Sequence, residues 1–109
     1  MRIMAIDYGD AHTGVAISDA TGMLTGFTAV IPSRKSQSAA EEIGKLAASH
    51  GVEELVVGLP RNMDGTEGPR AELCRAFARQ LEEITGLSPV LWDERRTTVE
   101  AHNILHQSG

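Results

Sequence analysis

The stretch IDYGDAHTGVAISD (residues 6–19) decides how the chain begins to fold. An apolar segment runs directly into Asp7, a turn containing Gly9 follows, and a second apolar segment returns at once. This pattern predicts two antiparallel strands joined by a short connection. Asp7 has two interpretations. It either accepts amide hydrogen bonds from Gly9 or Asp10 within the turn, or it lies at the open end of a sheet and binds a positive group.

The segments around this stretch extend the hairpin into a sheet. Residues 2–6, 13–18 and 24–31 are rich in apolar and β-branched side chains. The short links between them predict an antiparallel meander of three strands. Pro32 is expected to end the third strand, because proline cannot donate a hydrogen bond to a central ladder.

The rest of the chain alternates helix and strand signals. Ser38 and Glu41 form a capping box that predicts the start of a helix, and Gly51 is expected to close that helix. Consecutive β-rich apolar residues predict a buried strand at 54–60. Residues 89–92 are expected to form a fifth strand.

Two more helices are predicted in the second half of the chain. Pro69 suits the first turn of a helix that ends at Gly86, and Thr97–Glu100 forms a capping box for a last helix. The sole cysteine, Cys74, is expected to be a small buried side chain rather than a reactive thiol. The residues expected on the buried face of the Pro69 helix are Leu73, Phe77, Leu81 and Ile84.

The predicted order of elements, βββαβαβα, indicates an α/β fold. The right-handed crossover rule places the two later strands parallel to the first, which gives a five-stranded mixed sheet covered by helices. With 109 residues the chain has room for about one domain. We therefore expect a single domain over residues 1–109.

Composition narrows the class of protein. Apolar residues make up 41% of the chain and charged residues 23%, which is typical of a globular protein and argues against disorder. The sequence has no apolar run of membrane-spanning length and no leader pattern, so a cytoplasmic protein is expected. A formal charge of −5 disfavours binding of nucleic acid over the whole surface. Such binding would need a local basic patch or bound cations.

The carboxyl ends of the parallel strands are expected to bring acidic side chains together. Asp7, the loop at 58–64 and the pair Asp93-Glu94 all follow predicted strands. Crowded carboxylates favour a bound divalent cation, and hard oxygen ligands favour Mg²⁺ or Mn²⁺. Such a cation can promote attack of water on a phosphodiester. Strand alternation lets only one member of Asp93-Glu94 share the face of Asp7, and the sequence does not say which one.

Basic residues near this edge have two interpretations as well. They could hold phosphates, or they could pair with neighbouring acids, as Arg70 could with Glu67. The histidines His102 and His106 have a spacing that can chelate zinc, but no third ligand is evident, so a surface pair is favoured. The basic residues concerned are Arg61, Arg70, Arg95 and Arg96.

Three blocks of the sequence resemble the signature blocks of the YqgF/RuvX family. They are DYGDAHTGVAISD (7–19), VVGLPRNMDGTEG (56–68) and DERRTTVEA (93–101), and they occur in order over nearly the whole chain. The resemblance implies an RNase H-like fold related to the RuvC resolvases. Members of the family have been described as Holliday junction resolvases and as the nuclease that matures the 5′ end of pre-16S rRNA.

The resemblance also implies roles for individual residues. It makes Asp7, Asp93 and Glu94 the catalytic acids, with Asp7 and Glu94 as ligands of Mg²⁺ or Mn²⁺. Together with the phosphate-clamp hypothesis it gives a set of residues expected to contact substrate. They are Gly9, His12, Arg61, Asp64, Gly65, Arg95, Thr97 and Thr98.

The sequence departs from the family pattern at two places. His12 stands where the family usually has a permanently charged basic residue, so this charge becomes titratable. The family also continues into a final helix with another catalytic aspartate, and the sequence lacks that helix. We therefore expect the acidic site to be incomplete within these 109 residues.

The leading hypothesis is a metal-dependent endonuclease that processes pre-16S rRNA during ribosome biogenesis. A Holliday junction nuclease and a non-catalytic RNA-binding or ribosome-assembly module are the alternatives. The partners would be structured RNA, branched DNA or ribosomal precursor particles, and a monomer or a homodimer is compatible with the sequence. ATP-dependent phosphoryl transfer is disfavoured, because 109 residues leave no room for a nucleotide cleft between two domains.

Overall fold

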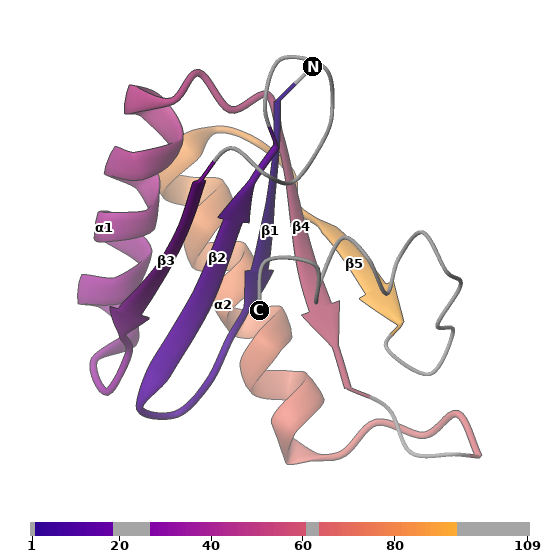
Figure 1. Ribbon diagram of the computed structural model, residues 1–109. Helices are drawn as coiled ribbons and strands as arrows, with labels where there is room; N and C mark the ends of the chain where they lie inside the picture. Colours follow the sequence, from indigo (N-terminus) through magenta and orange to yellow (C-terminus); the bar gives the residue numbers. More distant parts are fainter. Residues whose placement is uncertain (1, 19–26, 61–63, 94–109) are drawn as a thin grey trace.

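The structure is a computed structural model that describes residues 2–18, 27–60 and 64–93. Within these residues five strands form one mixed sheet, and two helices pack against it (Figure 1). The elements are β1 (Ile3–Asp7), β2 (His12–Ile17), β3 (Phe27–Pro32), α1 (Ser36–Ser49), β4 (Glu54–Leu59), α2 (Pro69–Thr85) and β5 (Val90–Asp93).

The sheet has the strand order β3-β2-β1-β4-β5. β1, β2 and β3 form an antiparallel meander, whereas β4 lies parallel to β1 and β5 lies parallel to β4. The predicted α/β fold and mixed sheet are therefore confirmed, and β3 ends at Pro32 as expected. The predicted last helix, with its capping box at 97–100 and the pair His102 and His106, lies outside the described residues.

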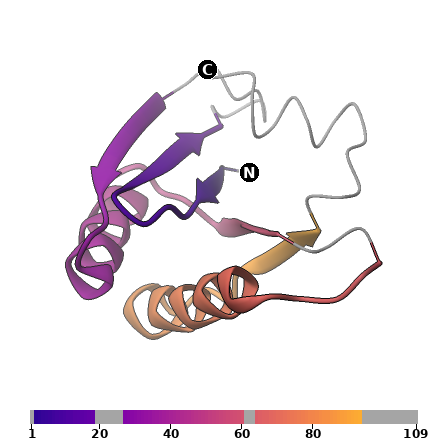
Figure 2. The ribbon, with the colours of Figure 1, turned by 90° about the horizontal axis from the view of Figure 1, so that it is seen from below.

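Both described helices cover the same face of the sheet (Figure 2). Alternate residues of the strands point toward them, and these side chains form the core with the apolar faces of α1 and α2. On the central strands, Met4, Ile6 and Val57 are fully buried in this way. The opposite face carries smaller and more exposed side chains, among them Val30, which is 69% exposed.

The start of α1 differs from the prediction. The helix begins at Ser36 with Lys35 as its N-cap, and no side chain caps it. The capping box expected from Ser38 and Glu41 is therefore wrong. The physical reason is tertiary: Ala39 is completely buried, so the backbone is already helical before it, and its amide donates to the carbonyl of Lys35 at 3.1 Å. The predicted end is confirmed, because Gly51 adopts a φ of 66° directly after the His50 C-cap.

The ends of α2 agree with the prediction, but its buried face is rotated. Pro69 lies in the first turn, and Gly86 caps the other end in the left-handed conformation. Phe77 is buried as predicted, whereas Leu73 is 49% exposed. Leu81 is also buried as predicted, Ile84 is 37% exposed, and the remaining buried positions of the helix are Ala71, Cys74 and Ala78. Small side chains let α2 approach the sheet closely, which moves the larger Leu73 to the margin of the contact.

Neither helix in the described part of the chain is long and apolar enough to cross a lipid bilayer.

Candidate active site at the carboxyl edge of the sheet

Four strands end at one edge of the sheet. The arrowheads of β1, β3, β4 and β5 point the same way in Figure 1, so Asp7, Pro32, Leu59 and Asp93 all lie at this edge. Carboxyl ends of strands in such sheets commonly border a ligand site. The expected meeting of β1, β4 and β5 at one edge is thus present in the structure.

Asp7 lies on the open face of the sheet, opposite the helices. It follows the buried Ile6 by one position, and strand alternation turns its side chain to the other face, where it is exposed. Its partner on β2 is Gly14, which has no side chain, so space remains beside the carboxylate. His12, two residues before Gly14 on β2, shares this face and is exposed. The structure therefore brings Asp7 and His12 onto one face.

Asp93 lies on the other face. It pairs in register with Leu59, which is 1% exposed and packs against Ala71 and Cys74 of α2. Paired residues of neighbouring strands point to the same side, so the register places Asp93 on the helix-covered face. Trp92, one residue earlier, belongs to the open face. The register therefore places Asp93 and Asp7 on opposite faces of the sheet, and Glu94 lies outside the described residues.

The turn after β1 is held by buried hydroxyl groups. The amide of Gly9 donates to Oγ1 of Thr13 at 3.3 Å, and the carbonyl of Gly9 accepts from Oγ of Ser33 at 2.5 Å. Thr13 and Ser33 are almost completely buried. The Gly9 amide therefore bonds to Thr13, and the interpretation of Asp7 as a turn residue that accepts this amide is not supported.

Gly9 is a packing requirement of this turn. A Cβ at this position would lie 2.1 Å from the carbonyl oxygen of His12, far inside van der Waals contact. Any side chain would therefore push the two arms of the turn apart. The sequence indicated neither this close approach nor the roles of Thr13 and Ser33, because a hydroxyl in a strand carries no signal of its distant partner.

Arg70 binds the same turn from α2. Its Nη2 donates to the carbonyl oxygen of Tyr8 at 2.5 Å, and its Nη1 forms an ion pair with Asp10. The pairing with Glu67 that the sequence suggested is wrong. Glu67 instead forms two hydrogen bonds of 2.7 Å with Arg75, and this carboxylate raises the pKa of Arg75.

The loop before α2 contains two of the predicted substrate contacts. Oδ1 of Asp64 accepts from the amide of Thr66 at 3.0 Å and from its hydroxyl at 2.6 Å, which closes a tight turn. Gly65 adopts a φ of 92°, a conformation that favours glycine. Both residues therefore shape the loop, whatever else they contact.

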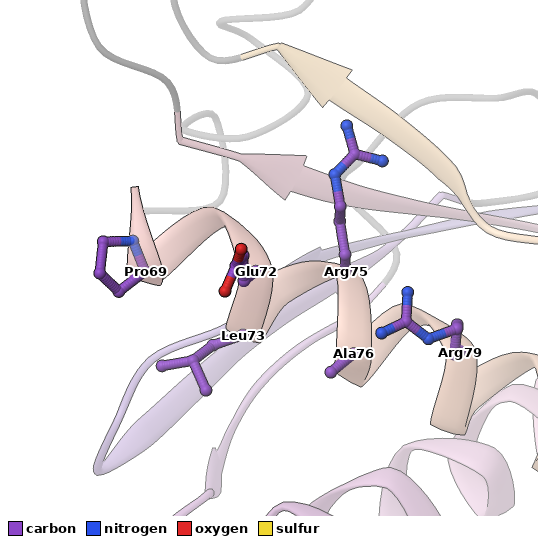
Figure 3. Close-up of a pocket in the computed structure, with 6 residues that line it drawn as sticks. All are labelled: Pro69, Glu72, Leu73, Arg75, Ala76 and Arg79. Atoms are coloured by element: carbon purple, nitrogen blue, oxygen red, sulfur yellow. The ribbon is translucent and has the colours of Figure 1, made fainter. Parts of the chain in front are cut away.

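The outer side of α2 carries an open depression of about 620 Å³ (Figure 3). Its lining is mixed, with Arg75 and Arg79 beside the acidic Glu72 and the apolar Leu73. None of the lining residues belongs to the predicted site, so this depression is separate from the Asp7 edge. The lining residues are Pro69, Glu72, Leu73, Arg75, Ala76 and Arg79.

Of the two predicted metal ligands, only Asp7 lies among the described residues. The described residues contain no group of three or more His, Cys, Asp or Glu residues close enough to bind a metal ion. Asp7 nevertheless fits one ligand position, because an exposed carboxylate beside Gly14 offers hard oxygen atoms with space around them. The remaining predicted residues lie outside the described residues, namely Arg61, Glu94, Arg95, Thr97 and Thr98.

Solved structures share this arrangement of strands and helices. Thermus thermophilus RuvC in complex with a Holliday junction substrate superposes with a TM-score of 0.68 at 10% identity, over 87% of this chain and 66% of RuvC. The ROK hexokinase from the same organism gives 0.61 at 21% identity, over 94% of this chain and 38% of the hexokinase. At such low identity these likenesses show the fold alone. The fold is of the RNase H-like class, with an acidic residue at the end of its central strand.

Sequence comparison identifies the family. A family model described as "RuvX: Holliday junction resolvase" matches residues 1–109, and the chain belongs to the RuvX family. The relative from Carboxydothermus hydrogenoformans is 48% identical over 105 residues, which are 96% of this chain and 76% of the relative. That from Pelotomaculum thermopropionicum is 46% identical over 106 residues, covering 96% and 69%. Both are named "Putative pre-16S rRNA nuclease". The resemblance seen in the three sequence blocks is confirmed.

Proposed function

We propose that this protein is a metal-dependent endonuclease that hydrolyses phosphodiester bonds at the 5′ end of pre-16S rRNA. The single observation that carries the proposal is the position of Asp7 in a chain of the RuvX family. Asp7 ends the central strand, faces the open side of the sheet and is exposed. The names of the relatives support RNA as the substrate. In this proposal the protein would act on ribosomal precursor particles in the cytoplasm.

The proposed metal ligands are Asp7 and Glu94. Register supports Glu94 over Asp93, because Asp93 pairs with the buried Leu59 on the helix-covered face. Asp93 stays the third proposed catalytic acid. A bound Mg²⁺ or Mn²⁺ would lower the pKa of a water molecule and stabilise negative charge at the phosphate.

The other predicted residues fall into two proposed roles. His12 shares the open face with Asp7 and would contact a phosphate of the substrate. The arginines and threonines that follow β4 and β5 would hold neighbouring phosphates and hydroxyls, namely Arg61, Arg95, Thr97 and Thr98. Gly9, Asp64 and Gly65 would act through the shape of their turns, as their contacts indicate.

The experiment compares the full-length wild-type protein with its Asp7→Asn variant on a 5′ fragment of pre-16S rRNA at saturating Mg²⁺. We expect wild-type cleavage and a loss of at least about 100-fold in the variant, because the amide removes a charged metal ligand. Chelation of the cation should abolish the wild-type activity. Undiminished cleavage by Asp7→Asn would remove Asp7 from the mechanism.

A second candidate function is cleavage of branched DNA. The description of the family model favours it, and the RuvC neighbour was solved with a Holliday junction. Symmetric cleavage of a junction needs paired sites, so this function predicts a homodimer, whereas RNA processing is compatible with a monomer. Assaying both substrates under one metal condition, with the mass of the complex measured by light scattering, separates the two. Binding of RNA without turnover of either substrate would instead favour the non-catalytic assembly module.

A further inference from the structure

We propose that Arg70 is a positioning residue for Asp7. It extends from the first turn of α2 to the turn that directly follows Asp7 and holds that turn against the helix. The inference rests on the proposed function, because the orientation of Asp7 matters for activity only if its carboxylate takes part in metal binding or chemistry.

Arg70 contacts both ends of the short segment from Tyr8 to Asp10. Its guanidinium donates to the carbonyl oxygen of Tyr8 at 2.5 Å and pairs with the carboxylate of Asp10. The central carbon of the guanidinium also lies 5.2 Å from the centre of the Tyr8 ring. The Asp10 carboxylate is 87% exposed, so its ion pair is solvated and weak, and the contacts to Tyr8 carry most of the effect.

Tyr8 is held firmly on the helix side of the sheet. Its ring stacks on Phe77, with the ring centres 4.2 Å apart and the planes 15° from parallel. Phe77 belongs to the buried core. The side chain of Tyr8 therefore lies between Arg70 and the buried ring of Phe77, both of α2.

Fixing Tyr8 fixes the orientation of Asp7. Neighbouring residues in an extended chain point to opposite faces, so a Tyr8 held against α2 requires Asp7 to face the open side. A rotation of Asp7 toward the helices would pull Tyr8 off Phe77 and break its bond to Arg70. Arg70 thus acts on Asp7 through the backbone, without contact between their side chains.

Arg70 is better suited to this role than to binding substrate. Both of its terminal nitrogens already bind the turn, and only 35% of its side chain is exposed. An arginine that binds a phosphate of the substrate needs its planar guanidinium directed to the solvent. Pro69 and the amides of Ala71 and Glu72, which donate to the carbonyl of Gly68 at 3.1 and 3.4 Å, fix the base of the arginine.

The test uses Arg70→Gln and the conservative variant Arg70→Lys, with Arg79→Gln as the matched control. Arg79 is an exposed arginine of the same helix that contributes to the outer depression. Cleavage of the pre-16S fragment is measured as kcat and KM over a range of Mg²⁺ concentrations. Binding is measured as a function of salt, and the affinity for Mn²⁺ alone is measured by water-proton relaxation.

We expect Arg70→Gln to lower kcat by about tenfold or more and to weaken Mn²⁺ binding, because a displaced carboxylate no longer meets the cation correctly. KM should stay within about twofold, and the salt slope of RNA binding should be unchanged. Arg70→Lys, which retains a donor for the Tyr8 carbonyl, should recover part of kcat. Arg79→Gln should match the wild type in every measurement.

Three results would overturn the proposal. A salt slope reduced by about one with kcat retained would make Arg70 a phosphate ligand. A lower melting temperature with unchanged kcat and Mn²⁺ affinity would make its role purely structural. If the wild type cleaves no substrate, the proposed function fails by itself, and Mn²⁺ affinity then decides on Arg70: equal affinity in Arg70→Gln and wild type overturns the proposal, and weaker affinity supports it.

Discussion

At the scale of single residues, the turn that follows Asp7 is held by Thr13, Ser33 and Arg70, which come from three different parts of the chain. Asp7 at the end of an apolar strand was predictable, because a carboxylate directly after buried positions is unusual. The bonds of Gly9 to Thr13 and Ser33 were not, since Ser33 lies 24 positions away. Arg70 is 62 positions from Tyr8, and a nearby acid, Glu67, made a local ion pair the simpler hypothesis. Hydrogen bonds between residues so far apart in the sequence leave no periodic pattern that would predict them.

The close approach at Gly9 gives a prediction for Gly9→Ala. The added Cβ would meet the carbonyl oxygen of His12 at 2.1 Å, and a backbone atom cannot rotate away. We expect unfolding to become easier by about 1–3 kcal/mol, with an additional loss of cleavage because the turn beside Asp7 moves. Thermal unfolding and the cleavage assay measure the two effects.

Gly14→Ala is the control for this prediction. The nearest atom to its new Cβ would be Cβ of Asp7 at 3.9 Å, an ordinary contact. The stability of Gly14→Ala should remain within about 0.5 kcal/mol of the wild type. Equal stability of the Gly9 and Gly14 variants would contradict the packing role assigned to Gly9.

At the scale of elements, the sequence predicted the existence and order of the helices and strands better than the start of α1 and the buried face of α2. The strands and the ends of α2 follow from local signals, namely β-rich runs, Pro69 and Gly86. The capping box at Ser38 failed because burial of Ala39 extends the helix toward Ser36. Leu73 failed because volume matters as well as polarity: close packing against the sheet selects the smaller side chains of α2.

The contact between α1 and α2 gives a prediction for Gly44→Ala. Gly44 is buried in α1, and a Cβ there would lie 2.5 Å from Cγ2 of Ile84 on α2. Alanine favours the helix by about 1 kcal/mol, but overpacking against a stiff β-branched side chain costs about 1–3 kcal/mol. We therefore expect a net loss of stability of about 1 kcal/mol in urea unfolding.

Truncating the opposing Ile84 side chain to Cβ tests the cause. In an Ile84→Ala background, Gly44→Ala should stabilise the protein, because only the helix preference of alanine remains. In a double-mutant cycle, the double variant should therefore lose less stability than the sum of the losses of the two single variants. A Gly44→Ala variant that is equally destabilised in both backgrounds would show that Ile84 is not the neighbour that matters.

At the scale of the whole molecule, the parallel crossovers assemble one edge from distant parts of the chain. The sequence predicted this assembly through the order of its elements, and the strand register added which residues share a face. Continuing the parallel register by one residue places Asp7 beside Gly58, which pairs with Trp92. Periodicity alone could not give this register, because it depends on how the strands align.

The alignment of Asp7, Gly58 and Trp92 across the sheet predicts a change in the fluorescence of Trp92, the sole tryptophan. Trp92 lies two strands from Asp7 on the same face, about 10 Å away by strand spacing. Mn²⁺ bound at Asp7 should quench its fluorescence because the ion is paramagnetic, whereas Mg²⁺ should not. In Asp7→Asn the quenching should require at least about tenfold more Mn²⁺. Quenching at the same concentration in both proteins would place the ion elsewhere.

The distance in sequence between Tyr8 and Arg70 also orders events during synthesis. The strands β1, β2 and β3 leave the ribosome first and can pair with one another, since their contacts are local along the chain. β1 gains its parallel neighbour β4 only after residue 59, and the arginine that binds the Tyr8 carbonyl follows later still. A nascent chain can therefore carry a paired meander before Arg70 is available to hold the turn that follows Asp7.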